Sequence, residues 1–440
     1  MDGSSINQQP DNLSDSFLNN LMAKYPQLFN DVLSKKEELG LQIIYTQIDR
    51  GKKEKAKPNF TDHTFNLNPG KYFYPASTVK LPVAILALQK LNELSIRGLD
   101  MNTTMLTESA GGNQTAVNND SSAAGGRPSI AHYIKKILLV SDNDAFNRLY
   151  EFLGQEYINN SLHKMGYNKV QILHRLDVSL TEEQNRATNP VAFFDENGKL
   201  LYRKQAENSR LIYTPRNIKL GKGYMQGGKL INEPFDFSKK NLLPLNDLHT
   251  MVRSILFPES LSKQQQFKLT KGDYEFLRRY MSMMPQESKS PVYTARDYWD
   301  TYVKFLFYGS VPGSANPDIR IFNKVGDAYG FLIDAAYIVD NKNNIEFLLS
   351  AVIHCNSDGI FNDNKYDYDT VGFPFMKNRR STTCSARCCP PVSTIRPSCG
   401  RAVFGRSYTS LRSAGWPGWV KRPISLIRIT TPRLMPTATC

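Results

Sequence analysis

The chain has 440 residues, 40% of them apolar, and its 55 Lys and Arg against 41 Asp and Glu give a net charge of +14. Twelve of the basic residues lie in residues 377–440, which hold no acidic residue, so the first 376 residues carry only +2. This near-neutral body argues against a nucleic-acid partner, and the apolar content excludes disorder of the whole chain. No run of 18 apolar residues is present, so no transmembrane segment is expected.

Residues 377–440 differ from the rest of the chain in composition. They are rich in Arg, Pro and Ser, contain five of the six cysteines, and show no amphipathic period. Cys384, Cys388 and Cys389 lack a second ligand pair, and no histidine follows His354, so we expect neither a metal nor a cofactor. We interpret this basic tail as extraneous to a domain that covers residues 14–376.

The N-terminal part of the chain predicts helix, strand and helix in turn. Residues 14–39 place apolar side chains at helical spacing behind a Ser/Asp start, which predicts one amphipathic helix lying on a sheet. Residues 41–48 and 64–67 predict strands. Residues 75–94 predict an apolar helix that Pro82 should kink.

The remaining segments complete the expected fold. After a polar loop at 102–128, the pattern predicts helices at 129–140, 144–153, 245–257 and 273–284, an insertion near 190–245, and strands at 319–325, 331–339 and 345–354. Strands at both chain ends predict one antiparallel sheet built from residues 14–74 and 311–376, and residues 75–310 form a mainly helical part. The fold class is therefore α/β, an α+β sandwich with flanking helices and an inserted helical subdomain.

One motif places a nucleophile beside a base. Ser77 and Lys80 are three residues apart at the start of the apolar helix, so they share a helical face and can touch. At a helix N-terminus, free N–H groups can stabilise an oxyanion, and a buried lysine can lose its proton. The same spacing occurs at Ser161–Lys164 and Ser260–Lys263, but no comparable apolar helix follows there.

Two further motifs follow in order along the chain. Ser141-Asp142-Asn143 separates two predicted helices, where such residues usually act as an N-cap; beside a Ser-Lys pair, Ser141 could pass a proton to the leaving group and Asn143 could hold a substrate amide. Lys324-Val325-Gly326 ends a predicted strand and offers a cation with backbone donors. Lys219-Leu220-Gly221 has similar spacing but no convincing strand context.

The segments PASTVKLPVA and VSDNDAFNRL and a strand-borne KVG resemble the S-x-x-K, S-D-N and K-T-G boxes of class A β-lactamases and penicillin-binding proteins. The resemblance implies a serine acyl-transfer enzyme in which Ser77 is the nucleophile and Lys80 its base. It further implies Ser141 as proton relay, Asn143 as amide ligand and Lys324 as the cation facing a carboxylate, with Gly326 and Asp327 on the strand that completes the oxyanion hole. Its backbone donors would be Ser77 and Asp327.

Two departures from the family pattern affect the expected activity. Val325 stands where the family has a hydroxyl that binds the β-lactam carboxylate, so carboxylate recognition should weaken. Deacylation needs a carboxylate between the second and third boxes, where Asp177, Glu182 and Glu183 are the candidates and Asp177 matches best.

A third departure concerns the fold. Family members end with a helix on the sheet, and the replacement of this helix by the tail predicts a partly exposed sheet face.

The resemblance leads to one preferred function and two alternatives. We expect hydrolysis of a β-lactam or related amide; the alternatives are a D-Ala-D-Ala carboxypeptidase or esterase, and a non-turnover sensor that binds β-lactams or peptidoglycan. The residues after Met1 lack the features of a signal peptide. Because substrates of this superfamily lie in the bacterial envelope, we expect a periplasmic or envelope location, with a removed leader that would allow a lipid anchor.

Overall fold

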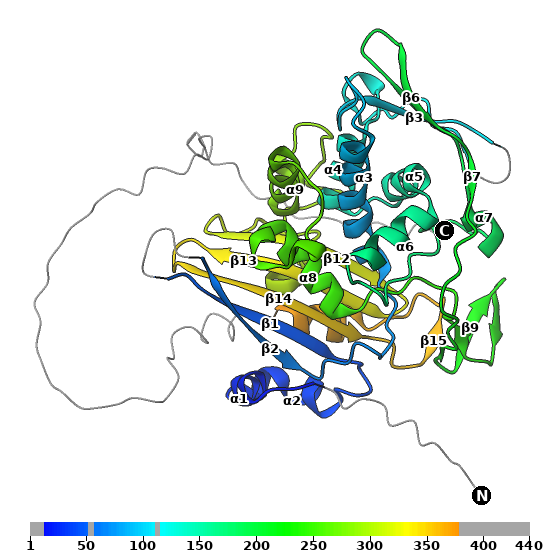
Figure 1. Ribbon diagram of the computed structural model, residues 1–440. Helices are drawn as coiled ribbons and strands as arrows, with labels where there is room; N and C mark the ends of the chain where they lie inside the picture. The colour runs from blue at the N-terminus through cyan, green and yellow to red at the C-terminus, as the bar shows by residue number, and fades with distance from the viewer. Residues whose placement is uncertain (1–12, 52–56, 111–114, 378–440) are drawn as a thin grey trace, which may run out of the picture. The chain divides into compact units, whose positions relative to one another are not determined.

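The computed structural model describes residues 13–51, 57–110 and 115–377 (Figure 1). All of them lie in the first of two compact units, Met1–Pro390 and Pro391–Cys440. The expectations for the basic tail and its cysteines fall on residues 378–440, outside the described residues. No described helix is long and apolar enough to cross a membrane.

The helices and the main strands have the following bounds. The helices are α1 (Ser16–Ala23), α2 (Pro26–Ser34), α3 (Lys80–Leu94), α4 (Ile130–Val140), α5 (Asn143–Leu153), α6 (Gln155–Lys164), α7 (Glu182–Arg186), α8 (Leu245–Leu256), α9 (Lys271–Ser282) and the short α10 (Phe305–Tyr308). A 3₁₀ turn, η1 (Ala76–Val79), leads directly into α3. The main strands are β1 (Gln42–Asp49), β2 (Asn59–Phe65), β12 (Ile319–Ala328), β13 (Phe331–Asp340) and β14 (Ile345–His354).

Strands from both ends of the described chain form the central sheet. Its order is β12-β13-β14-β1-β2, every neighbouring pair is antiparallel, and β12 is an edge strand. β1 and β14 join the two halves, with Ile44 opposite Ser350. The predicted α+β sandwich with a sheet assembled from both ends is confirmed.

Short strands form several smaller sheets. They are β3 (Thr104–Thr107), β4 (Ala187–Thr188), β5 (Val191–Phe194), β6 (Leu200–Lys204), β7 (Glu207–Asn208), β8 (Lys219–Leu220), β9 (Gly223–Gln226), β10 (Lys229–Ile231), β11 (Phe235–Asp236) and β15 (Ile360–Phe361). They pair as β3-β5-β6, β10-β9-β15, β11-β8 and β4-β7. Most of them lie in the stretch near 190–245, where the sequence predicts only an insertion.

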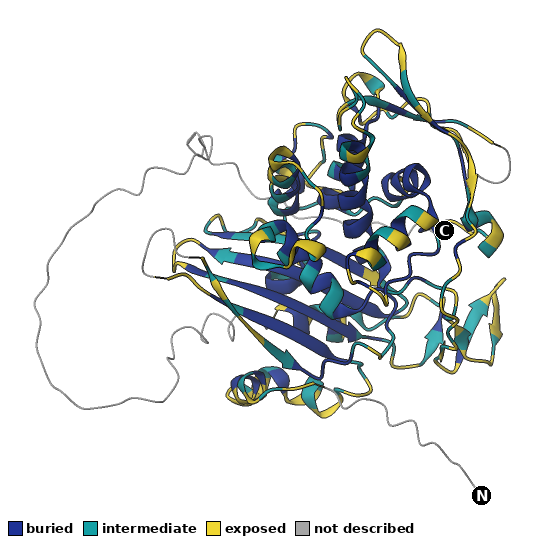
Figure 2. Ribbon diagram, viewed as in Figure 1, coloured by how far each residue is buried: buried dark blue, intermediate teal, exposed yellow. Residues whose placement is uncertain are grey.

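Alternating side chains of the central strands feed two apolar clusters. On one face, Ile44 and Ile48 pack with α3, α4, α5, α8 and α9. On the other, Ile43 and Tyr45 pack with α1, α2 and two later segments, residues 303–307 and 373–376. Figure 2 shows the central strands and α3 as largely buried, whereas α1 and α2 expose their outer sides. The molecule is therefore layered, with the sheet between two sets of helices.

Four expectations are corrected by the structure. The predicted helix 14–39 is two helices, because the chain bends before Pro26, which takes the first position of α2. The polar loop 102–128 contains β3, and α6 was not expected. Pro82 does not interrupt α3, since it lies in the first turn, where N–H groups have no intrahelical partner. The second sheet face is covered: Phe375 and Met376, 2% and 0% exposed, pack on it.

Candidate active site

Ser77 lies in the 3₁₀ turn η1, whereas the sequence predicts it in the first turn of the α-helix; α3 begins only at Lys80. The preceding residue, Ala76, has a left-handed φ of +46°, which is strained for a residue with a side chain and recurs at functional sites. Its neighbours Thr78 and Val79 are fully buried, but Ser77 is partly exposed. The Ser77 hydroxyl makes no hydrogen bond to any residue that the structure describes, so it is free to meet a ligand.

Lys80 is fully buried at the start of α3. Its Nζ donates to Asn143 Oδ1 at 2.6 Å, to Ser141 Oγ at 3.3 Å and to the Ser141 carbonyl oxygen. Burial lowers the Lys80 pKa to about 7, although the negative charges of Asp142, Asp327 and Asp177 act in the opposite direction. The expected Ser77–Lys80 contact is not formed here; the amine instead extends to the α4–α5 junction.

The Ser141-Asp142-Asn143 triplet acts both as helix cap and as part of the site. Ser141 ends α4 in a left-handed conformation, with φ +61°. The Asp142 side chain caps α5 by accepting from the Ala145 N–H at 2.7 Å, and it pairs with Lys136. The cap therefore turns the chain so that Ser141 and Asn143 both reach Lys80.

Strand β12 brings Lys324 to the same point. Lys324 is 2% exposed, and its Nζ donates to Ser141 Oγ and to the Val325 carbonyl, each at 2.8 Å. Burial first, and then the charge of Lys80, hold the Lys324 pKa well below its usual value. Lys219, the rival by spacing, is exposed on β8 instead. The structure thus joins Lys324, and not Lys219, to the triplet.

Gly326 lets β12 approach η1. A Cβ at this position would lie 2.8 Å from the Pro75 carbonyl oxygen and 2.9 Å from the Ser77 nitrogen. Such distances are too short for a real side chain, so any larger residue would push the strand and the turn apart. The close approach brings the β12 backbone at Gly326 next to the Ser77 N–H, and Asp327, whose side chain is exposed, follows directly.

Asp177 approaches the site from the loop between α6 and α7. It is exposed, has a left-handed φ of +57°, and its Oδ2 accepts from Asn143 Nδ2 at 3.3 Å. Glu182 instead binds Lys239 at 2.5 Å and the Tyr213 hydroxyl at 2.7 Å, which lowers its pKa to about 2. Among the three carboxylates that the sequence offers, Asp177 is the one in contact with a site residue.

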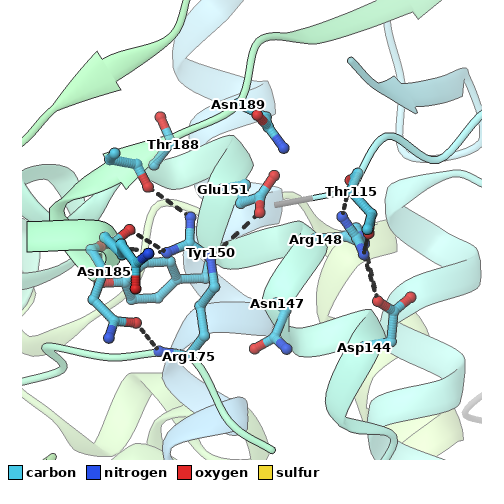
Figure 3. Close-up of polar contacts among 12 residues, drawn as sticks. Thr115, Asp144, Asn147, Arg148, Tyr150, Glu151, Arg175, Asn185, Thr188 and Asn189 are labelled. Atoms are coloured by element: carbon cyan, nitrogen blue, oxygen red, sulfur yellow. Dashed lines mark hydrogen bonds and ion pairs between the residues drawn. The ribbon is translucent and has the colours of Figure 1, made fainter. Parts of the chain in front are cut away.

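Buried polar contacts fix this loop to α5 (Figure 3). Arg175 forms an ion pair with Glu151 at 3.3 Å, and both side chains are 2% exposed. Arg175 also donates to the Ala187 carbonyl at 2.7 Å, which ties the two ends of the loop together. Asn147 exchanges two hydrogen bonds of 2.9 Å with the backbone of Leu176, the residue before Asp177. The loop is therefore held at the helix whose first residue is Asn143.

A pocket beside β12 contains residues that the sequence analysis missed. It measures about 710 Å³ and is lined by Ser141, by Val325 and Asp327 of β12, and by side chains from residues 299–312 and 369–377. Trp299 and Tyr302 lie in a stretch with two further tyrosines, Tyr293 and Tyr298. That aromatic density is the one sequence signal that could have marked the segment.

Comparison with known proteins gives a family match. A family model described as the β-lactamase enzyme family matches residues 29–270. No curated protein matches the chain. Lys324, Gly326 and Asp327 lie beyond the matched residues.

Solved structures of similar fold share little sequence with the chain. A β-lactamase from Sphaerobacter thermophilus is 11% identical, with a TM-score of 0.44, over 86% of this chain and 99% of that one. A class A β-lactamase from Clostridium kluyveri is 13% identical, with a TM-score of 0.45, over 82% and 99%. A mutant of PBP-A in an acyl-enzyme complex with penicillin G is 15% identical, with a TM-score of 0.44, over 84% and 97%. On the family match, which spans more than half of its length, this chain belongs to the β-lactamase enzyme family and has the fold of the serine hydrolases of that family.

Proposed function

We propose that the protein is a serine hydrolase that cleaves a β-lactam or a related amide through an acyl-enzyme on Ser77. The observation that carries the proposal is the convergence of Lys80, Ser141, Asn143 and Lys324, from three separate segments, behind a partly exposed serine with a free hydroxyl. A lysine with a pKa of about 7 can accept the serine proton at neutral pH.

The proposed reaction has two halves. In acylation, neutral Lys80 takes the Ser77 proton, Ser77 Oγ forms a bond to the carbonyl carbon, and the N–H groups of Ser77 and Asp327 bind the oxyanion. The bond to the leaving nitrogen breaks as Ser141, held by Lys324, gives that nitrogen a proton. The Lys80 ammonium, 3.3 Å from Ser141 Oγ, returns a proton to Ser141 and is neutral again. In deacylation, Asp177 takes a proton from a water whose oxygen bonds to the ester carbon. The bond from that carbon to Ser77 Oγ then breaks, and the proton held by Asp177 returns to Ser77 Oγ, which restores both groups.

Mass spectrometry of the intact protein after incubation with benzylpenicillin tests the nucleophile. We expect an adduct on Ser77 that Ser77→Ala abolishes, and Lys80→Ala should slow its formation by roughly two to four orders of magnitude, the usual size of general-base catalysis. The matched controls are Ser161→Ala and Ser260→Ala, which remove serines with the same spacing to a lysine. An adduct mapped to either control serine would contradict the proposal.

A second candidate function is a penicillin-binding carboxypeptidase, esterase or sensor that acylates but turns over slowly. The observation that favours it is the short reach of Asp177, which is one methylene shorter than the glutamate of class A enzymes and is exposed to solvent. Glu182 is held in ion pairs away from Asn143, so it offers no replacement. A wild-type acyl-enzyme that persists for hours would support this candidate.

A further inference from the structure

The pocket of about 710 Å³ beside β12 has an apolar, aromatic lining. Trp299, Tyr302, Phe305 and Phe373 contribute to it, together with Val325 of β12. The Trp299 indole N–H donates to the Ser310 carbonyl oxygen at 3.1 Å, which fixes the ring. A pocket of this size and lining is suited to an apolar group of a small ligand.

The charged groups around the pocket make it a poor place for an anion. Asp327 and Asp369 line it with their carboxyl groups, and among the described residues 13–51, 57–110 and 115–377 Lys377 is the one cation that does so. Desolvation raises the pKa of the Asp327 carboxyl, and the charges of Lys324 and Lys80 act in the opposite direction. Lys324 is not among the residues that line the pocket, and its Nζ donates to Ser141 and Val325. Because its pKa is lowered, Lys324 is also a weaker counter-charge for an anion than an ordinary lysine. Val325 adds no hydroxyl donor. A carboxylate entering the pocket would thus meet the charge of Asp369 and, in its ionised form, that of Asp327.

Ser141 connects the pocket to the reaction. In the proposed mechanism its hydroxyl gives a proton to the leaving group, so the leaving group must lie within hydrogen-bond distance of Ser141 Oγ. Ser141 also lines the pocket. The pocket is therefore a place into which the rest of a leaving group next to Ser141 can extend. In a penicillin, the carbon next to the leaving nitrogen carries a carboxylate. The acidic groups that line the pocket would repel that carboxylate.

We propose that this pocket receives the leaving group of the substrate and selects an apolar leaving group that carries no carboxylate. The inference rests on the proposed function and narrows its substrate class to amides or esters whose leaving amine or alcohol is not an amino acid with a free carboxylate.

Acylation rates for three forms of one β-lactam test the inference. The probes are benzylpenicillin, its methyl ester and its trimethylammonioethyl ester, which share the acyl group; each rate is divided by the rate of alkaline hydrolysis of the same compound. We expect the methyl ester to acylate Ser77 roughly tenfold or more faster than the free acid, because like charges oppose the acid. The cationic ester should react at least as fast as the methyl ester.

The outcomes separate this inference from the function on which it rests. If the free acid acylates as fast as the methyl ester or faster, the leaving-group inference is overturned while the Ser77 acyl-enzyme stands. If none of the three compounds labels Ser77, the proposed function fails and the inference fails with it.

Variants test the residues that carry the selection. Asp327→Asn and Asp369→Asn should each lower the ratio of the acylation rate of the methyl ester to that of the free acid. Each substitution removes a negative charge but keeps the shape of the side chain. Val325→Thr should speed the free acid alone, by roughly one to two orders of magnitude if its hydroxyl binds the carboxylate in the transition state. Glu275→Gln, an exposed carboxylate on α9 outside the pocket, is the matched control and should leave the ratio unchanged. A ratio that Asp327→Asn and Asp369→Asn leave unchanged would overturn the electrostatic basis of the inference.

Discussion

At Lys80, desolvation and neighbouring charges act on one amine in opposite directions. Burial favours the neutral form, whereas Asp142, Asp327 and Asp177 favour the charged form, and the balance leaves a pKa of about 7. Because this pKa lies below the usual 10.5, the Lys80 amine is mostly neutral in the folded protein between about pH 7 and pH 10.5, where a free lysine is mostly charged. In the proposed mechanism, Lys80 therefore serves as a base and not only as a positive charge in the site.

The acylation rate should therefore depend on pH in a defined direction. The neutral fraction of Lys80 rises as the pH passes upward through about 7, so the rate should rise through that value and level off above it. Adduct formation followed by mass spectrometry between acid and mildly alkaline pH measures this profile, with hydroxide-driven hydrolysis subtracted. A flat profile up to about pH 10 would contradict a lysine base.

A second buried lysine makes a control necessary. Lys304 is fully buried on the other face of β12, where it donates to Met281, Ile321 and Asn323, and burial lowers its pKa to about 7 as well. The residual acylation of Lys80→Ala should lose the inflection near pH 7. If the inflection persists in that variant, it belongs to another group such as Lys304.

At Asp177, the prediction concerns turnover. Asp177→Asn keeps the size of the side chain and the hydrogen bond from Asn143 but removes the base, so the acyl-enzyme should decay roughly a hundredfold or more slowly. Acylation should change little. Time courses of the adduct mass measure both steps, and Glu183→Gln, an exposed neighbour in α7, is the matched control. A wild-type acyl-enzyme that persists for hours and is unchanged by Asp177→Asn would favour the penicillin-binding or sensor function.

The sequence identifies the site residues better than it identifies their contacts. Ser77, Lys80, Ser141, Asn143 and Lys324 are found by spacing and by the kind of element around them. Spacing could not predict that Lys80 turns from Ser77 to Ser141, since that depends on how α3 packs against the α4–α5 junction. The need for Gly326 is a contact between segments about 250 residues apart, which no local pattern records.

Among the elements, long periodic segments are predictable and short or polar ones are not. The buried strands β13 and β14 and the helices α3, α4 and α8 follow clear apolar periods. Helix α6 begins Gln155-Glu156-Tyr157 and has few apolar positions, so it was missed. The strands between β4 and β11 are two to five residues long, too short to show a period, and their pairing depends on distant partners such as Phe361.

A buried ion pair between Arg175 and Glu151 is one of the contacts that hold the loop carrying Asp177, and its contribution to stability can be tested. Arg175→Met leaves the Glu151 carboxylate buried without its partner, which should lower the free energy of unfolding by about 3–5 kcal/mol. Deacylation should slow as well, because Leu176 and Asp177 lose their anchor. Denaturant titration measures the first effect and adduct decay the second.

Two comparisons keep that prediction specific. Lys271→Met breaks an exposed pair with Glu275 and should cost at most about 1 kcal/mol. Arg175→Met combined with Glu151→Leu removes both charges and should recover part of the lost stability. A loss below about 1 kcal/mol for Arg175→Met alone would mean that Asn147 and the backbone hydrogen bonds hold the loop without the ion pair.

At the scale of the whole molecule, the central sheet and its covering helices are complete only when both ends of residues 13–377 are present. β1 and β2 come from the N-terminal part; β1 pairs with β14, and β2 pairs with β1. Helices α1 and α2 and residues 373–376 cover the same face of the sheet. The segments of the candidate site, from η1 to β12, lie between these two ends in the sequence. Loss of β1 and β2 would leave β14 as an edge strand, and loss of residues 373–376 would uncover the sheet face on which Phe375 and Met376 pack. Strand β12, which carries Lys324, is the edge opposite β2.

The boundary of the folded domain can be set by two truncations. The sequence after residue 380 lacks an amphipathic period, so deleting residues 381–440 should leave the thermal midpoint unchanged. Deleting from residue 373 also removes Phe375 and Met376, which are almost fully buried against the sheet, and should lower it sharply. The point variant Phe375→Ala isolates that contact and should cost about 3–5 kcal/mol. A clear fall in thermal midpoint on removing residues 381–440 alone would show that the tail contributes to the fold, contrary to the interpretation from its composition.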